Sequence, residues 1–506
     1  MTSQTKTETA TKVGVVAEET ATAIPELDAT QNEVIATLAS TFEFWQTSAT
    51  AYNPLESHDS IETRYEAGQA IRKRVPLESH AEWKPPEHRP SGVDFVVAGN
   101  AGRQEQFVPL RMGRMAASPF AFLRGAAAVM AWDLSHTSIS GIQVIIDGDA
   151  HINNFGLYGT AQRDVVVDLN DFDEAIPGPF EWDLKRLVAS VNVAARGNGL
   201  NKRERRRAVK ECVAGYRFNL ERLHPMGIMD VWSIYGYADR KPKFIDVPKK
   251  SWALIQKTVE KARATTNETL LPKVARRQSD GGWRFVEDPP ILTRVDEDTR
   301  TKVIGSLVAY SETLPLGPRQ MLRRYSVADV AHRVVGVGSV GTRAYLVLMF
   351  GNGDQDPLFL QVKESVVPAH APYLPPIPWK APHHGFRVVS GQRMLQAEGD
   401  PLLGYTAIDG RDYFVRQMKN MKASMPLEWL TGEPFNFWVF VCGGLLARAH
   451  SRMGDAAKIA GYCGKSEAFD EALAEFAEAY GDQTETDHAS LVKAIKKGRV
   501  KAVEGI

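Results

Sequence analysis

Two short apolar runs that each end in acidic residues constrain the fold of this chain more than any other feature. Residues 142–146 form an apolar run that ends in Asp-Gly-Asp at 147–149, and residues 165–167 form another that leads into acidic residues. Runs of this length are typical of short buried strands. Residues 181–196 then have the pattern of a helix. The sequence predicts two strand ends that place carboxylates close together, with a helix directly after them.

Length and composition are those of a folded chain with more than one packed unit. The chain has 506 residues, of which 43% are hydrophobic and 24% are charged, and these values predict two or three units with sizeable cores. Lys+Arg and Asp+Glu number 61 each, which argues against wholesale binding of nucleic acid or an anionic membrane. The three scattered cysteines predict neither a disulfide framework nor a zinc site.

No segment has the pattern of a signal peptide or of a membrane span. We therefore expect a cytoplasmic protein without membrane or nucleic-acid partners. Residues 1–30 are rich in Thr, Ala and Glu and predict a disordered tail. Residues 240–300 are charged and irregular and predict a connecting region, while residues 435–452 and 468–480 give the clearest late helices.

The segment 148–156, GDAHINNFG, contains the residue types that phosphoryl transfer requires. Asp149 can accept the proton of a hydroxyl group, and Asn154 can hold a metal ion through its side-chain oxygen. A second carboxylate must bridge the metal to the phosphates, and Asp171 is well placed after the second apolar run. Asp168 is a rival because it follows that run directly. Each residue alone is more typical of a turn, but their order favours a functional site.

These motifs resemble the protein-kinase-like superfamily, most closely its aminoglycoside-phosphotransferase branch. That branch carries G-D-x-H-x-x-N, then an Asp-aromatic-acidic triplet, then a further Asp, and Asp183 lies twelve residues after Asp171 in this chain. The resemblance implies a scaffolding role for Asp183, which would hydrogen-bond the backbone of the catalytic loop. It implies Asp149, His151 and Asp183 as catalytic residues and Asn154, Asp171 and Asp173 as metal ligands.

A glycine-rich run lies downstream of these motifs, although kinase-like enzymes carry it upstream. Residues 336–341 read GVGSVG and are followed by two strand patterns, the second of which ends at Lys363. A Rossmann loop would open a helix, so the pattern favours a hairpin over phosphates with a lysine that neutralises them. An unrelated glycine-rich turn is the alternative. The resemblance implies that Gly336, Gly338, Ser339, Gly341 and Lys363 bind a nucleotide.

Two features depart from the kinase pattern. The usual partner of the lysine is a Glu on a helix, and residues 388–398 are the candidate helix, with Glu398 the candidate partner and Gln396 its competitor. Arg124 has no counterpart; it either binds phosphate or pairs with an acidic neighbour. Residues 410–419 predict the strand that leads to the adenine-binding hinge.

The predicted fold class is α+β, a two-lobed protein-kinase-like fold that is circularly permuted and carries extra helices. Permutation is tolerated where chain termini lie close together on the surface. The predicted domains are a disordered tail (1–30), an N-terminal arm and wrapping segment (31–111), a helical lobe with the catalytic loop and an insert (112–330), a nucleotide-binding β lobe (331–420) and C-terminal helices that pack on the helical lobe (421–506).

Residues 112–490 as a whole resemble a bacterial family catalogued as domain of unknown function 2252. The segments that carry this resemblance include SPFAFLRGAA, GDAHINNFG, GVGSVGTR, LQVKES and LARAHSR. The family name implies no substrate.

The expected activity is transfer of the γ-phosphoryl group of ATP to a hydroxyl, with ATP and Mg²⁺ as cofactors and an unidentified small-molecule or protein acceptor. Nucleotidyl transfer is one alternative and would use the same residues with the nucleotide bound in the opposite orientation. A nucleotide-binding pseudokinase is the non-enzymatic alternative. A metallophosphoesterase is less favoured, because Asp133 and His136 have the wrong spacing for two metals.

Overall fold

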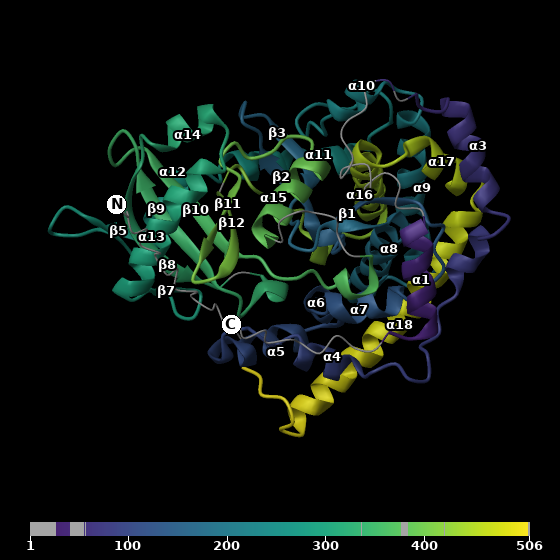
Figure 1. Ribbon diagram of the computed structural model, residues 1–506, viewed down its shortest axis with the longest axis horizontal. Helices are drawn as coiled ribbons and strands as arrows, with labels where there is room; N and C mark the ends of the chain where they lie inside the picture. Colours follow the sequence, from purple (N-terminus) through teal and green to yellow (C-terminus); the bar gives the residue numbers. More distant parts are fainter. Residues whose placement is uncertain are drawn as a thin grey trace, which may run out of the picture.

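The computed structural model describes residues 27–40, 55, 57–334, 336–375, 383–418 and 420–503. A six-stranded sheet with its own helices lies on one side of the molecule, and a larger helical part lies on the other (Figure 1). The predicted α+β class is therefore confirmed. The acidic residues singled out above lie between these two parts.

The large sheet is antiparallel, with the order β11-β12-β10-β9-β8-β7. Its strands are β7 (Leu292–Arg294), β8 (Ser326–Arg333), β9 (Ala344–Phe350), β10 (Pro357–Glu364), β11 (Gly404–Ile408) and β12 (Arg411–Gln417). The central strands read as continuous apolar runs because both faces of the sheet are covered. Every residue of β10 is buried, the charged Lys363 and Glu364 included.

Alternate residues of β10 pack on opposite faces of the sheet. Leu360 and Val362 belong to a core that includes Val303 and Tyr310 of α13, whereas Phe359 packs with α12 and β6. Lys363 shares its face with Phe359, because side chains two apart on a strand point the same way. The surrounding elements are α12 (Asn267–Val274), β5 (Ala275–Arg277), β6 (Trp283–Phe285), α13 (Glu297–Glu312), α14 (Leu316–Leu322) and α15 (His384–Leu395).

The prediction of an irregular connection over residues 240–300 is wrong. This stretch contains α11 (Lys249–Arg263), α12 and three strands. Its charges lie on solvent faces, while Val259 and Ala262 of α11 are buried. The sheet thus begins at Leu292, ahead of the expected β-lobe boundary at residue 331.

The helical part is built around α8, α9, α16 and α18. Its helices are α5 (Val108–Ala116), α6 (Pro119–Gly125), α7 (Ala127–Leu134), α8 (Phe180–Gly197), α9 (Lys202–Leu223), α10 (Ile228–Trp232), α16 (Gly432–Met453), α17 (Ala456–Cys463) and α18 (Ala468–Lys496). Both predicted late helices are present, and α18 extends past its expected end. The three cysteines are buried and free.

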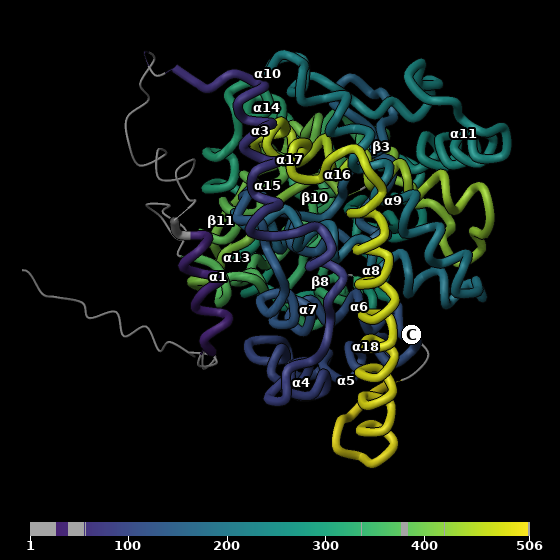
Figure 2. The backbone as a smooth tube through the Cα atoms, turned by 90° about the vertical axis from the view of Figure 1, so that its right-hand side faces the viewer, coloured from purple at the N-terminus to yellow at the C-terminus, as the bar shows by residue number. Residues whose placement is uncertain are grey.

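The N-terminal segment lies along this helical part. It contains α1 (Ala29–Ser40), α3 (Ile61–Ile71), η2 (Leu77–Ala81), α4 (Gly92–Ala98) and η3 (Glu105–Phe107). Figure 2 shows α18 running beside α4. The predicted tail lies outside the described residues up to residue 26, and its last residues already belong to α1. Within the described part of the chain, no helix is long and apolar enough to cross a membrane.

Helices α9 and α16 approach each other closely through glycines. A Cβ atom at Gly443 would lie 2.0 Å from the carbonyl oxygen of Cys212, and one at Gly215 would lie 2.1 Å from that of Phe440. Backbone atoms on rigid helices cannot give way to such a contact. The crossing therefore depends on small residues at these two positions.

We expect Gly443→Ala to lower the free energy of unfolding by about 1–3 kcal/mol, because the added methyl group overpacks the crossing. Gly305, in α13, has no atom within 4 Å of an added Cβ. Gly305→Ala is the matched control and should raise stability by up to ~1 kcal/mol. Urea denaturation of both variants measures the difference. Equal stability of the two variants would contradict the described crossing.

Candidate functional site

The acidic loop, residues 147–154, lies between two small antiparallel pairs of strands. It follows β1 (Gln143–Ile146), which pairs with β4 (Ile176–Pro179), and it leads through η4 (Ile152–Asn154) into β2 (Phe155–Gly159) and β3 (Val165–Leu169). Gly148 has φ +78, and a Cβ there would lie 2.4 Å from the carbonyl oxygen of Glu174. Only glycine fits this turn.

Asp183, near the start of α8, holds the acidic loop by its backbone. Its carboxylate accepts hydrogen bonds from the amides of Asp147 (2.6 Å) and Gly148 (2.9 Å). Its Oδ2 also lies 3.2 Å from Nε2 of His450 on α16. Asp183 and His450 are buried, so this carboxylate fixes the loop against two helices at once.

The carboxylate of Asp149 is held by Arg186, which lies on α8 together with Asp183. Its Oδ1 accepts bonds from Nε (2.9 Å) and Nη2 (2.7 Å) of Arg186. Burial raises the pKa of Asp149 to about 6, although Arg186 opposes this shift. The second oxygen, Oδ2, lies 3.8 Å from Nε2 of His151. Burial, with Arg124 and Arg186 nearby, holds the pKa of His151 well below its usual value, so the ring is neutral.

Asn154 closes the loop back on itself. Its side-chain amide nitrogen donates to the backbone oxygen of Asp149 at 2.6 Å. Because the nitrogen is used in this way, the amide oxygen is the side-chain atom left to bind a ligand.

The two rival carboxylates, Asp168 within β3 and Asp171 just after it, have different environments. Asp168 is buried, pairs with Arg448 of α16 and accepts from the amide of Ala397 at 2.9 Å. Asp171 lies instead on the open side of the loop, 4.0 Å from Nζ of Lys363. The geometry therefore assigns Asp168 to packing and leaves Asp171 available to a ligand.

Lys363 joins the sheet to the acidic residues. It is only 3% exposed. Its ammonium donates to Oδ2 of Asp173. Burial alone would lower the pKa of Lys363, but Asp171 and Asp173 outweigh it and the pKa is raised. The pKa of Asp171 falls to about 2, since Lys363 and Arg416 overcome the effect of burial.

The glycine-rich turn, residues 336–341, connects the antiparallel strands β8 and β9. A Rossmann arrangement is thereby excluded, because the turn contains only the short 3-10 helix η5 (Val337–Ser339) and leads into a strand, not an α-helix. Gly341 has φ +89. The turn also contacts the N-terminal segment, since Arg103 donates to the oxygen of Val340 (2.6 Å) and the amide of Gln104 donates to that of Gly341 (2.8 Å).

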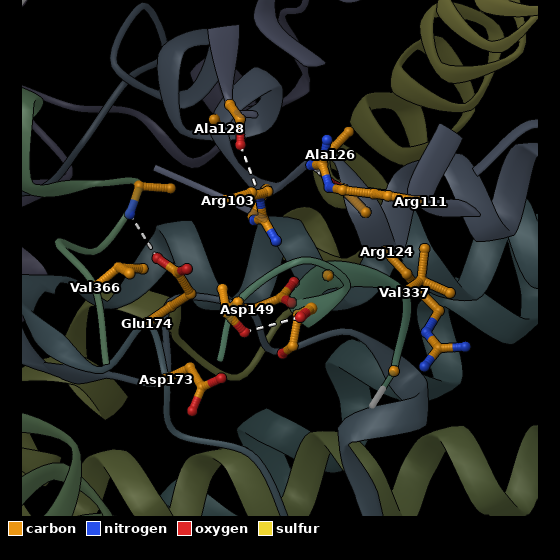
Figure 3. Close-up of a pocket in the computed structure, with 18 of the residues that line it drawn as sticks. Arg103, Arg111, Arg124, Ala126, Ala128, Asp149, Asp173, Glu174, Val337 and Val366 are labelled. Carbon is orange, nitrogen blue, oxygen red and sulfur yellow. Dashed lines mark hydrogen bonds between the residues drawn. The ribbon is translucent and has the colours of Figure 1, made fainter. Parts of the chain in front are cut away.

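One cavity of about 470 Å³ lies between the sheet and the helical part. Figure 3 shows Arg103, Asp149, Asp173, Glu174 and Val337 around it. The predicted residues that line it are Arg124, Asp149, His151, Asn154, Asp171, Asp173, Gly336, Gly338, Ser339 and Lys363. Residues more than 150 positions apart in the sequence thus meet at one site.

Three predicted residues lie elsewhere or act indirectly. Asp183 supports the loop from behind. Gly341 packs against Arg103, since a Cβ atom at this position would lie 3.1 Å from the Cβ of Arg103. Glu398 is not the partner of Lys363. The helix α15 ends at Leu395, and the Glu398 carboxylate accepts instead from the hydroxyl of Tyr235 at 3.2 Å. Gln396 donates to the backbone oxygen of Leu169 and does not reach the lysine either.

Arg124 lines the cavity and has no hydrogen-bond or ion-pair partner among the residues that the structure describes. Its Nε is buried. Burial lowers its pKa, and the charges of Asp149 and Asp171 act against that shift. A cation without a fixed partner is suited to an anionic ligand.

Several residues that line the cavity or support it were not found from the sequence. The sequence contained one indication of Arg186. It follows Asp183 by three residues and so lies on the same face of α8. Glu174, whose pKa burial raises to about 7, was hidden in an acidic run. Arg103 and Arg416 come from segments with no motif. Only the tertiary fold brings them to the cavity.

The sequence of this chain matches the family described as "Uncharacterized protein conserved in bacteria (DUF2252)" over residues 103–494. The chain belongs to this family. The resemblance of residues 112–490 to this family is thereby confirmed. The acidic loop, Asp183, the glycine-rich turn and Lys363 all lie within the DUF2252 region. No curated protein and no solved structure matches the chain.

In this DUF2252 protein we expect Asp183→Ala to lower the free energy of unfolding by about 3 kcal/mol or more, because three buried donors lose their acceptor. Asp183→Asn keeps one acceptor oxygen and should have a smaller effect. Asp298→Ala, at a largely exposed position of α13, is the control and should change stability by less than about 0.5 kcal/mol. Denaturant unfolding of all three measures this order. If Asp183→Ala were as stable as the control, the described role would be wrong.

Proposed function

We propose that this protein binds ATP with Mg²⁺ in the cavity and transfers a phosphorus-containing group to a hydroxyl acceptor. The observation that carries the proposal is the meeting of Lys363, the glycine-rich turn and the acidic loop around one cavity. Phosphoryl-transfer sites need these parts because the chemistry depends on positioning and charge stabilisation. The group transferred is the γ-phosphoryl group when ATP binds in the orientation usual for kinases. It is the nucleotidyl group when ATP binds in the opposite orientation.

The donor set fits Mg²⁺. Oδ1 of Asp171 and Oδ1 of Asp173 are buried carboxylate oxygens without a hydrogen-bond partner among the described residues. With the side-chain oxygen of Asn154 they offer the hard oxygen ligands that Mg²⁺ prefers. When bound there, the ion would neutralise phosphate charge and orient the phosphates.

The remaining groups have separable tasks. Glycines let the backbone of the turn approach phosphates, and Lys363 adds a fixed positive charge. The free oxygen of Asp149 accepts the proton of the acceptor hydroxyl, while Arg186 fixes the orientation of that carboxylate. Asp183 keeps the loop in place through two backbone amides and acts through the loop alone.

The order of elements supports a permuted kinase-like fold. From β8 the chain passes through the glycine-rich turn to β9, then to β10 with Lys363, then through α15 to the hairpin β11–β12 and on to α16. Kinases place the glycine-rich loop and the lysine in this order. Here the acidic loop precedes all of them in the sequence.

The alternatives have less support. Asp133 pairs with Arg89 and accepts from Tyr480, and His136 contacts Asp28. Neither residue lines the cavity, so neither would complete a two-metal phosphoesterase site there. A nucleotide-binding pseudokinase is disfavoured because Asp149, Asn154, Asp171 and Lys363 all lie at one cavity.

The wild-type protein should turn over ATP in the presence of Mg²⁺, and EDTA should abolish turnover. Asp149→Ala should reduce it by about 10²-fold or more, because a positioned base is lost. Asp298→Ala, remote on α13, should retain wild-type turnover. Product formation followed by chromatography measures these rates. Equal turnover in wild type and Asp149→Ala would refute the proposed reaction.

The partner of Lys363 can be tested by binding. Asp173→Asn should weaken Mg²⁺-ATP binding by about tenfold or more, because a metal ligand and the lysine partner are both altered. Glu398→Gln should bind with wild-type affinity, since its side chain faces Tyr235. Titration calorimetry with a non-hydrolysable ATP analogue provides both constants. The opposite pattern would restore Glu398 as the partner.

A further inference from the structure

The orientation of the nucleotide can be inferred from what fills each end of the cavity. Gln361 lies two residues before Lys363 and points to the same face of β10. A base that extended from phosphates at Lys363 toward the connection between β12 and α16 would have to lie over Gln361. This is the position of the predicted adenine-binding hinge.

That position is occupied by a charged group. Arg416 of β12 donates through Nε to the side-chain oxygen of Gln361 (3.2 Å) and through Nη1 to the backbone oxygen of Asn170 (3.1 Å). Its guanidinium group thus lies where a flat apolar ring would bind. Guanidinium groups are suited to phosphate oxygens instead.

The space beyond Arg416 is also too small for a base. The separate cavity lined by Arg416, Met418 and Asn420 has a volume of about 50 Å³. A volume of this size holds one or a few water molecules, while ligand sites have several hundred Å³. A purine ring therefore has no room at the hinge end in this arrangement.

The other end of the main cavity has small apolar side chains. Ala126 and Ala128 lie there in Figure 3, and Arg103 lies between Ala128 and Asp149. The guanidinium of Arg103 is held in place by bonds from Nε to the oxygen of Gly99 (2.8 Å) and from Nη1 to that of Val340 (2.6 Å). A fixed planar cation beside small apolar side chains is a suitable surface for an aromatic base.

The polar groups along the cavity follow the same order. Arg416 contacts the backbone oxygen of Asn170, next to Asp171, and Figure 3 shows Asp149 between Asp173 and Arg103. The sequence of groups is therefore Arg416, the metal-binding carboxylates, Asp149, and then the apolar end with Arg103. A triphosphate with its terminal phosphates at Arg416 would have its α-phosphate beside Asp149.

We infer that ATP binds in the reversed orientation, with its base between α4 and α7 and its terminal phosphates at Arg416, and that the protein transfers the nucleotidyl group. This inference rests on the proposed function and specifies it. The acceptor oxygen attacks the α-phosphorus and its proton passes to Asp149. The bond from the α-phosphorus to the bridging oxygen breaks, and the electron pair leaves with pyrophosphate.

The products of slow ATP hydrolysis, with water as acceptor, test the orientation directly. The full chain is incubated with ATP and Mg²⁺, and the nucleotides are separated by anion-exchange chromatography. AMP with pyrophosphate is the expected result. ADP with phosphate would overturn the reversed orientation and leave the proposed function intact. If neither product pair exceeded the amount formed by the Asp149→Ala control, both the reversed orientation and the proposed function would be overturned.

Binding of the two halves of ATP gives an independent test. Arg416→Met should weaken the binding of Mg²⁺-pyrophosphate by about tenfold or more, because charge-assisted bonds are lost, and should leave AMP binding unchanged. Ala128→Leu should do the reverse by narrowing the base end. Arg294→Met, at an exposed position of β7, is the control for both.

Thermal melting establishes that each of these variants is folded. Where Arg416→Met is unstable, Arg416→Lys keeps the charge and should weaken pyrophosphate binding less. Loss of AMP binding in the Arg416 variant, with pyrophosphate binding retained, would place the base at the hinge and overturn the inference.

Discussion

The burial of Lys363 between the sheet and the acidic residues is the constraint on which the rest of the structure depends. The ammonium group of a lysine that is only 3% exposed must find opposite charges, because an unpaired charge in this environment is strongly destabilising. Asp173 and Asp171 supply them from a segment 190 residues away in the sequence. The pairing fixes the distance between the two parts of the molecule. Oδ1 of each carboxylate is buried and has no hydrogen bond among the described residues, so a bound cation would complete the charge balance.

The rigidity of the acidic loop has a separate origin in the helical part. Asp183 holds the loop backbone and Arg186 holds the Asp149 carboxylate, both from the first turns of α8. His450 ties Asp183 to α16. The glycine-mediated crossing of α9 and α16 keeps α16 in place. Stability and site geometry are thus linked through a few helices. A change in the packing of these helices should also change the position of the acidic loop.

Much of the candidate site could be predicted because its parts are local motifs. Asp149, Asn154 and Asp183 depend on short spacings along one loop and one helix, and the glycine-rich hairpin with Lys363 is likewise continuous in the sequence. The α+β class follows from the same apolar runs. The predictions that failed concern a helix end, a charged segment and tertiary contacts. Glu398 was chosen from the expected extent of a helix that ends at Leu395, and the elements of residues 240–300 were hidden by solvent-facing charges. Arg103, Arg416 and the choice between Asp168 and Asp171 depend on tertiary contacts that no local pattern contains.

The central claim is that one metal-bound triphosphate lies between Lys363 and the acidic loop. A crystal grown with Mn²⁺ and a non-hydrolysable ATP analogue tests it most directly, because manganese can be located by its anomalous scattering. We predict a peak within coordination distance of Asp171 and the side-chain oxygen of Asn154, with phosphate density beside the ammonium of Lys363. A peak at another surface, with these carboxylates still bound to the lysine alone, would contradict the account.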